Sequence, residues 1–158
     1  MKRAATLAAC FLLAGCGFHP LYGTSTGPRM SNIFVEPIAE RDGYEMRNQL
    51  IDMLGSDGQE AGKRYRLKIT LNESSNGIAL QNDATITRYN TTLGAKFVLS
   101  DAQGTELYHG EQSELTAYNV VQSPYATQVA QMDSSKRAAQ DLAERIRLQL
   151  AVWFRTHK

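Results

Sequence analysis

One short run in this chain has residue types and spacing that suit covalent chemistry: Leu13-Ala14-Gly15-Cys16. The small side chains of Ala14 and Gly15 let a peptidase approach the backbone just before Cys16. The thiol of Cys16 is a nucleophile that can take up a diacylglycerol group. The run therefore predicts cleavage before Cys16 and attachment of a lipid to its sulfur.

The residues before this run have the layout of a bacterial secretory signal peptide. Lys2 and Arg3 give a basic start, and a short apolar stretch covers 4–13. The alternative is a transmembrane helix that happens to end in a cysteine. That helix would need about 20 apolar residues, and the stretch has roughly half as many. We therefore expect 1–15 to be a lipoprotein signal peptide that is removed.

Cleavage before Cys16 leaves 143 residues, enough for one domain with its own apolar core. Because Lys2 and Arg3 leave with the signal peptide, 15 basic residues then face 16 acidic ones. Such a near-neutral chain argues against nucleic acid as a partner, which requires a basic excess. Cys10 is lost as well, so no disulfide is expected and stability must come from packing.

The residues after Cys16 bear on where the protein is anchored. In Gram-negative bacteria an aspartate directly after the lipidated cysteine tends to retain the protein at the inner membrane, and Gly17 stands there instead. We expect a lipid anchor in the outer membrane, on its periplasmic side. Residues 16–31 are rich in glycine and proline and are predicted to be a tether. Phe18 and Tyr22 are expected at the level of the lipid headgroups.

The apolar residues of the predicted domain, 32–158, change their period along the chain. Met46, Leu50 and Leu54 recur at helical spacing, whereas Leu67 and Ile69 alternate with polar residues as in a half-buried strand. The sequence predicts strand 32–36, helix 44–54, strand 64–71, a turn at 72–77, strands 88–99 and 105–121, and a final helix. Ile78 and Leu80 extend the strand beyond the turn or start another.

Two boundaries stay open. The final helix begins at Pro124 with Ser123 as its N-cap, or near Asp133-Ser134-Ser135, which is a second cap signal. The irregular alternation of apolar and polar residues in 105–121 fits either a strand with a bulge or an edge strand with both faces partly exposed to solvent. The predicted fold class is α+β, a small mixed sheet of about four strands with two helices packed on one face, in the order β-α-β-β-β-α.

The sequence contains no recognisable catalytic or metal-binding constellation. His19, His109 and His157 lack metal-ligand spacing. The run Gly55-Ser56-Asp57-Gly58 lacks the lysine and helix of a phosphate loop. We interpret the carboxylates of Asp52, Asp57 and Glu60 as a solvated helix end and loop. No enzymatic activity, metal or cofactor is expected.

A set of basic residues at strand spacing is the more specific signal. Arg64, Arg66 and Lys68 stand at i, i+2 and i+4, which places them on one side of a strand. Arg88 and Lys96 join them if the next strand pairs in register. Such a stripe could bind phosphate groups, with each arginine contacting two oxygens. The alternative is a charged face that prevents edge pairing and keeps the protein soluble.

The run from Leu13 to Tyr22 resembles the start of the lipopolysaccharide (LPS) assembly lipoprotein family, LptE, whose members often have Cys-Gly-Phe/Trp-His after the lipobox. Arg47-Asn48-Gln49-Leu50 on the first helix fits the same family. So does a long final helix with Arg137-Ala138-Ala139 that ends near Trp153-Phe154.

The resemblance implies a non-enzymatic subunit that plugs the LPS-assembly outer-membrane β-barrel, supports the folding of that barrel and binds LPS. LPS is also the characteristic anionic ligand of the outer membrane, so Arg64, Arg66, Lys68, Arg88 and Lys96 are candidates to contact it. The alternative is a lipoprotein of another envelope machine, such as a lipid-transporter auxiliary or a secretion pilotin.

Overall fold

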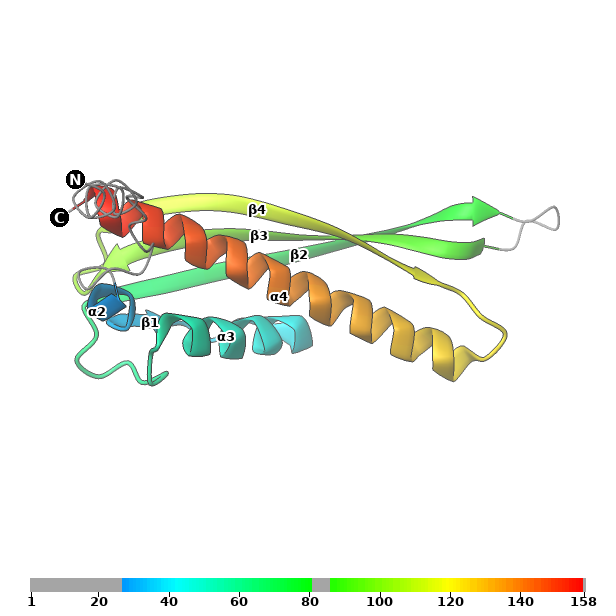
Figure 1. The fold of residues 1–158 in the computed structure, drawn as a ribbon, viewed down its shortest axis with the longest axis horizontal. Helices are drawn as coiled ribbons and strands as arrows, with labels where there is room; N and C mark the ends of the chain where they lie inside the picture. The colour runs from blue at the N-terminus through cyan, green and yellow to red at the C-terminus, as the bar shows by residue number, and fades with distance from the viewer. Residues whose placement is uncertain (1–26, 81–85, 158) are drawn as a thin grey trace, which may run out of the picture.

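The computed structural model describes residues 27–80 and 86–157 (Figure 1). The predicted signal peptide, Cys16 and most of the predicted tether lie outside these residues. In chain order the elements are α2 (Gly27–Met30), β1 (Ile33–Val35), α3 (Glu40–Leu54), β2 (Tyr65–Leu80), β3 (Ile86–Asp101), β4 (Glu106–Asn119) and α4 (Pro124–Thr156). The predicted α+β class and element order are confirmed, with α2 added in front.

The sheet has four strands in the order β1-β2-β3-β4. β1 runs parallel to β2, and the other neighbours are antiparallel, so the sheet is mixed as predicted. Leu67 of β2 lies opposite Leu99 of β3, and Ile69 lies opposite Phe97. All four side chains are buried, which defines the inner face of the sheet.

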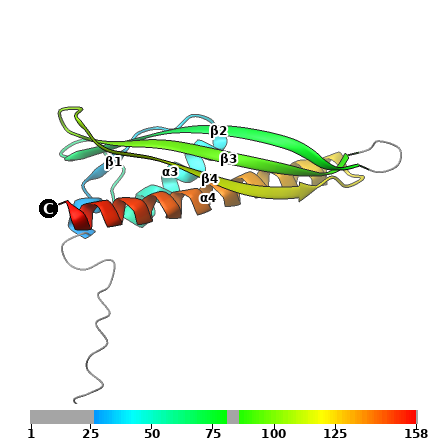
Figure 2. The same cartoon turned by 90° about the horizontal axis from the view of Figure 1, so that it is seen from above.

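Both long helices cover this inner face (Figure 2). α3 contributes Met46, Leu50 and Leu54, which recur at helical spacing and are buried. α4 packs against α3 and against β4, and its length of 33 residues corresponds to about 50 Å. The predicted packing of two helices on one face is confirmed.

α4 is one continuous helix that begins at Pro124, which decides between the two predicted starts. The hydroxyl of Ser123 accepts a hydrogen bond from the Ala126 N–H at 3.3 Å, and Pro124 takes the first helical position. The stripe that packs on the protein interior contains many small residues. Its buried members are Ser134, Ser135, Ala138, Ala139, Leu142, Ala143, Ile146, Leu150, Ala151 and Phe154.

The turn predicted at 72–77 is wrong, because β2 continues through it to Leu80. Pairing with β3 overrides the local turn preference, since Asn72 lies opposite Gly94 and Gly77 opposite Tyr89. The register shifts only between Gly77 and Leu80. The β2–β3 ribbon consequently extends well beyond α3 (Figure 1).

Two further boundaries differ from the predictions. Gly27–Met30 is a helical turn with Met30 buried, so the folded part includes residues assigned to the tether. α3 begins at Glu40 rather than near residue 44, because its first turn carries polar residues that give no helical apolar signal. β4 is an edge strand with no fully buried residue, and the β3–β4 register shifts between Leu99 and Ser100, so both features considered for 105–121 are present.

Candidate functional site

The outer face of the sheet carries most of the predicted basic residues. Within 27–80 and 86–157 no helix covers this face (Figure 2). It is formed by every second residue of β2, β3 and β4, the ones opposite in parity to the buried set. Its members along the centre of the sheet are Arg66, Lys68, Thr70, Thr92, Lys96, Val98, His109, Glu111, Ser113 and Leu115.

Arg66 is already engaged by acidic side chains. Its guanidinium group forms an ion pair with Glu60 and lies 3.9 Å from the carboxylate of Glu36. The same group lies 6.0 Å from the ring centroid of Phe34. Arg66 therefore ties β2 to the loop after α3 and to the residue after β1, and little of its charge is left for a ligand.

Lys68 and Lys96 lie near each other on the outer face, as predicted from an in-register pairing. Lys68 is opposite Val98, and Lys96 is opposite Thr70, so the two lysines are diagonal neighbours across β2 and β3. Lys96 lies 3.9 Å from Glu111 and is 68% exposed. No described residue pairs with the exposed side chain of Lys68. These two lysines are the basic groups most accessible to an anion on this face.

A shallow hollow of about 480 Å³ lies beside Lys96. It is lined by the charged or titratable side chains of Lys96, Glu106, His109 and Glu111 and by the neighbouring backbone. Nδ1 of His109 lies 2.6 Å from the Glu106 carboxylate. The outer face is thus a polar surface with interspersed charges of both signs.

Arg64 and Arg88 stand apart from the two lysines. Arg64 precedes β2, and its backbone N–H donates to the carbonyl of Asn32 at 3.2 Å. Arg88 lies opposite Ala79 and Asn119, eight residues from Lys96 along β3, which corresponds to about 26 Å. The structure therefore brings Arg66, Lys68 and Lys96 together, and it does not bring Arg88 to them.

The end of α4 forms a second polar centre, which the sequence did not reveal. The guanidinium group of Arg29 donates to the carbonyl of Phe154 at 3.0 Å and to that of His157, and it lies 4.8 Å from the Phe154 ring centroid. A cation at the carbonyl end of a helix is favourable because that end carries partial negative charge. Arg29 thus joins α2 to the C-terminal end of α4.

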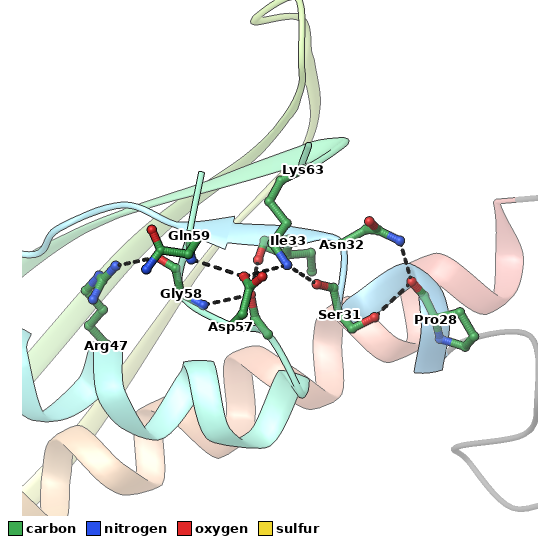
Figure 3. A network of polar contacts seen from close by, with 10 residues as sticks. Pro28, Ser31, Asn32, Ile33, Arg47, Asp57, Gly58, Gln59 and Lys63 are labelled. Carbon is green, nitrogen blue, oxygen red and sulfur yellow. Dashed lines mark hydrogen bonds and ion pairs between the residues drawn. The ribbon is translucent and has the colours of Figure 1, made fainter. Parts of the chain in front are cut away.

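A network on the other side of α2 completes this attachment (Figure 3). The carbonyl of Pro28 accepts hydrogen bonds from Ser31 at 3.1 Å and Asn32 at 2.8 Å. Lys63 donates to the carbonyl of Ser31 at 2.9 Å and pairs with Asp57 at 2.8 Å. The first described residues are therefore fixed to the loop before β2, which holds the entry of the chain in one place.

A third polar centre lies where the start of α3 meets β2. Asp42 and Glu73 share a hydrogen bond between their carboxyl groups, next to Glu40, in a hollow of about 280 Å³. Burial raises the pKa of Asp42, and the hydrogen bond with Glu73 opposes that rise. Burial, followed by the charge of Asp42, raises the pKa of Glu73. The hydrogen bond between the two groups thus lowers the pKa of Asp42 and raises that of Glu73.

Two features are absent from the described part of the chain. No group of three or more His, Cys, Asp or Glu side chains in it is arranged to hold a metal ion. No helix in it has the length and apolar character needed to cross a bilayer.

The α+β fold of this domain is shared with solved structures of lipoproteins. The chain is similar to a putative lipoprotein from Caulobacter crescentus CB15, with 30% identity and a TM-score of 0.67, covering 84% of this chain and 97% of that one. It has the fold of rare lipoprotein B from Shewanella oneidensis, at 12% identity and a TM-score of 0.59 over 76% of this chain and 93% of that one. An uncharacterised protein of Rickettsia prowazekii (strain Madrid E) is 27% identical over 148 residues, which is 92% of each chain.

The match to a protein family is more specific than these likenesses. Residues 30–150 match the LptE family, which is described as lipopolysaccharide-assembly. The matched range runs from the end of α2 to Leu150 on α4 and so includes the whole sheet, all of α3 and most of α4. This chain belongs to the LptE lipopolysaccharide-assembly family, as its sequence motifs predicted.

The carboxyl pair of Asp42 and Glu73 predicts a pH dependence of stability. Both pKa values are raised in the folded state, so folding is favoured by this pair at low pH. That contribution is lost as the pH rises from the ordinary carboxyl range near 4 through the raised folded values. Glu73→Gln should flatten the stability curve over this range and stabilise the protein at pH 7 by about 0.5 kcal/mol.

Urea unfolding of the full-length protein in detergent, followed by circular dichroism at pH 4.5 and pH 7, measures this effect. Asp141→Asn on the exposed side of α4 is the matched control and should leave the pH dependence unchanged. If the free energy of unfolding changed between pH 4.5 and pH 7 by the same amount in Glu73→Gln as in the wild type, the carboxyl pair would not titrate as described.

Proposed function

We propose that this protein is an outer-membrane lipoprotein that fills and supports the β-barrel of LPS assembly, held at the membrane by a lipid on Cys16. Its membership of the LptE family supports a role in LPS assembly. The observation that carries the finer proposal is the bare outer face of the sheet. Most of its side chains are polar, whereas the other face of the same strands carries the buried apolar residues Leu67, Ile69, Leu93, Phe97 and Leu99.

The chemistry of this face suits the interior of a wide barrel. The lumen of a large outer-membrane barrel is polar, whereas its lipid-facing surface is apolar. Thr70, Thr92 and Ser113 offer hydrogen bonds, and the ion pairs of Arg66 and Lys96 balance charge within the face. A polar wall can cover such a surface provided that it supplies a partner for Lys68, whose charge has none among the described residues of this face.

The elongated shape supports the same proposal. α4 and the β2–β3 ribbon lie along the long axis of the molecule (Figure 1). A plug of this form can contact strands of a barrel over a long distance. It can also support them while the barrel closes, because a barrel is without free edges only once closed.

Lys68 and Lys96 are the residues we propose for contact with LPS phosphate groups. They are exposed neighbours, and an ammonium group binds phosphate as a point charge. Arg66 has acidic partners, and Arg64 and Arg88 lie away from the pair. This narrows the five candidates of the basic stripe to two.

Copurification tests the barrel proposal. The tagged full-length protein, extracted from outer membranes in mild detergent, should bring down a large β-barrel protein at near one-to-one ratio. An unrelated outer-membrane lipoprotein with the same tag is the control. Recovery of inner-membrane transporter subunits in place of a barrel would contradict the proposal and favour a lipid-transporter auxiliary.

Charge reversal tests the LPS contact. Lys68→Glu combined with Lys96→Glu should weaken binding of purified LPS about tenfold, because two attractions become two repulsions. Arg41→Glu combined with Arg155→Glu changes the net charge equally at exposed sites on α3 and α4. An equal loss in both double variants, or unchanged affinity in a folded Lys68/Lys96 variant, would exclude a specific contact at this face.

A further inference from the structure

An apolar groove of about 400 Å³ lies between the C-terminal part of α4 and the edge strand β4. Leu148 and Val152 are 37% and 45% exposed there, although they belong to a helix whose neighbouring turns are tightly packed. Large apolar side chains gathered in a groove indicate a surface that another group covers. The lining residues are Tyr108, Leu148, Gln149, Val152, Trp153 and Thr156.

Gln149 indicates what kind of group covers the groove. Its side-chain oxygen is buried and receives no hydrogen bond within residues 27–80 and 86–157. The same oxygen lies over the backbone of β4, since a Cβ built on Gly110 would be 3.0 Å from it. A buried acceptor without a donor is unfavourable. Gln149 also lines the groove, so its side chain adds a polar group to the lining that a peptide backbone can match and a hydrocarbon chain cannot.

The groove lies at the place where the chain enters the domain. Arg29 of α2 contacts Phe154, with 4.8 Å between the guanidinium carbon and the ring centroid. The ring of Phe154 in turn lies 4.9 Å from that of Trp153, which lines the groove. α2, which begins the described part of the chain, and the groove therefore share the same end of α4.

We propose that residues 18–22, which carry Phe18, Leu21 and Tyr22, dock in this groove. Tyr22 lies five positions before Gly27, with four residues between them, and an extended chain over five positions reaches on the order of 17 Å. This reach exceeds the distance between the Arg29 guanidinium group and the Trp153 ring, since these groups lie 4.8 and 4.9 Å from the centroid of the Phe154 ring. The three apolar side chains match the apolar part of the lining, and their backbone can match its polar groups.

The covalent connection favours this segment over a separate partner. A group joined to the domain by a short linker has an effective concentration in the millimolar range without any further contact. Docking would hold the lipidated Cys16 close to the C-terminal end of α4 and fix which end of the domain faces the membrane. This inference concerns the protein alone and does not depend on a barrel or on LPS.

Disulfide cross-linking tests the docking in the full-length acylated protein, whose Cys16 sulfur carries the lipid. Leu21→Cys with Val152→Cys should form an intramolecular disulfide under mild oxidation. Leu21→Cys with Val129→Cys is the matched control. Val129 has nearly the same exposure, 44%, but lies near the other end of α4. Equal cross-linking in both variants, no cross-link at 152, or a disulfide-linked dimer as the main product would overturn the proposal.

Fluorescence gives an independent readout, because Trp153 is the only tryptophan in the chain. In nanodiscs, Phe18→Ser with Leu21→Ser and Tyr22→Ser should shift its emission to the red and at least double its quenching by acrylamide. The control triple variant Thr24→Ala, Ser25→Ala and Thr26→Ala should behave like the wild type. Unchanged emission in the first variant would overturn the proposal. The proposal would also be overturned if added phospholipid changed the Trp153 emission while the triple serine substitution did not. That result would identify an acyl chain as the occupant of the groove.

Discussion

The packing of α4 along the inner face of the sheet is the constraint on which the rest of the structure depends. Ala138, Ala139, Ala143 and Ala151 are fully buried, and these small side chains let the helix approach its neighbours closely. Leu142, Ile146 and Leu150 fill the space between them. With α3 packed beside α4, the buried apolar residues of the sheet are covered from one side. The opposite face is left to the solvent or to a partner, so the surface proposed to meet a barrel follows from how the core is built.

The end of α4 has a second consequence, because it organises the entry of the chain. Arg29 satisfies carbonyl groups that the last turn of a helix leaves without an intrahelical partner. The Phe154 ring, which Arg29 contacts, lies 4.9 Å from the ring of Trp153 and 5.0 Å from that of Tyr65, measured between centroids. Any tension transmitted from the proposed lipid anchor reaches the domain at this point. The helix that completes the core therefore also provides the attachment for the tether.

The sequence predicted most of this fold, because the elements that carry the core also carry clear periodicity. Leu142, Ile146 and Leu150 recur at helical spacing, and Leu67 and Ile69 alternate, so α4 and the first half of β2 were recognisable. None of the first ten residues of α4 is fully buried, so the sequence carries no apolar periodicity there that decides between the two predicted helix starts. The second half of β2 was predicted as a turn, since its Asn, Ser and Gly residues favour turns in isolation. Only pairing with β3, including a hydrogen bond of 3.1 Å between Ser75 and Thr91, keeps it extended.

The candidate sites were less predictable, because they depend on contacts between distant parts of the chain. Parity alone placed Arg66 and Lys68 on one face and allowed Lys96 to join them. It could not reveal that Glu36 and Glu60 engage Arg66, or that Arg88 lies about 26 Å from Lys96. The pairing of Asp42 with Glu73 joins residues 31 positions apart, and neither has a local sequence signal. Arg29 was placed in the tether, although it caps a helix end more than 120 residues away.

The central claim is that the bare outer face of the sheet meets the wall of the assembly barrel. Site-specific photo-cross-linking tests it most directly, with a photoreactive amino acid at Thr70 and, separately, at Ser113, both exposed on that face. In outer membranes, irradiation should give an adduct of this protein with a large β-barrel protein from both positions. If the barrel copurifies but neither position forms an adduct with it, the outer face does not line the contact, and this account of the surface is wrong.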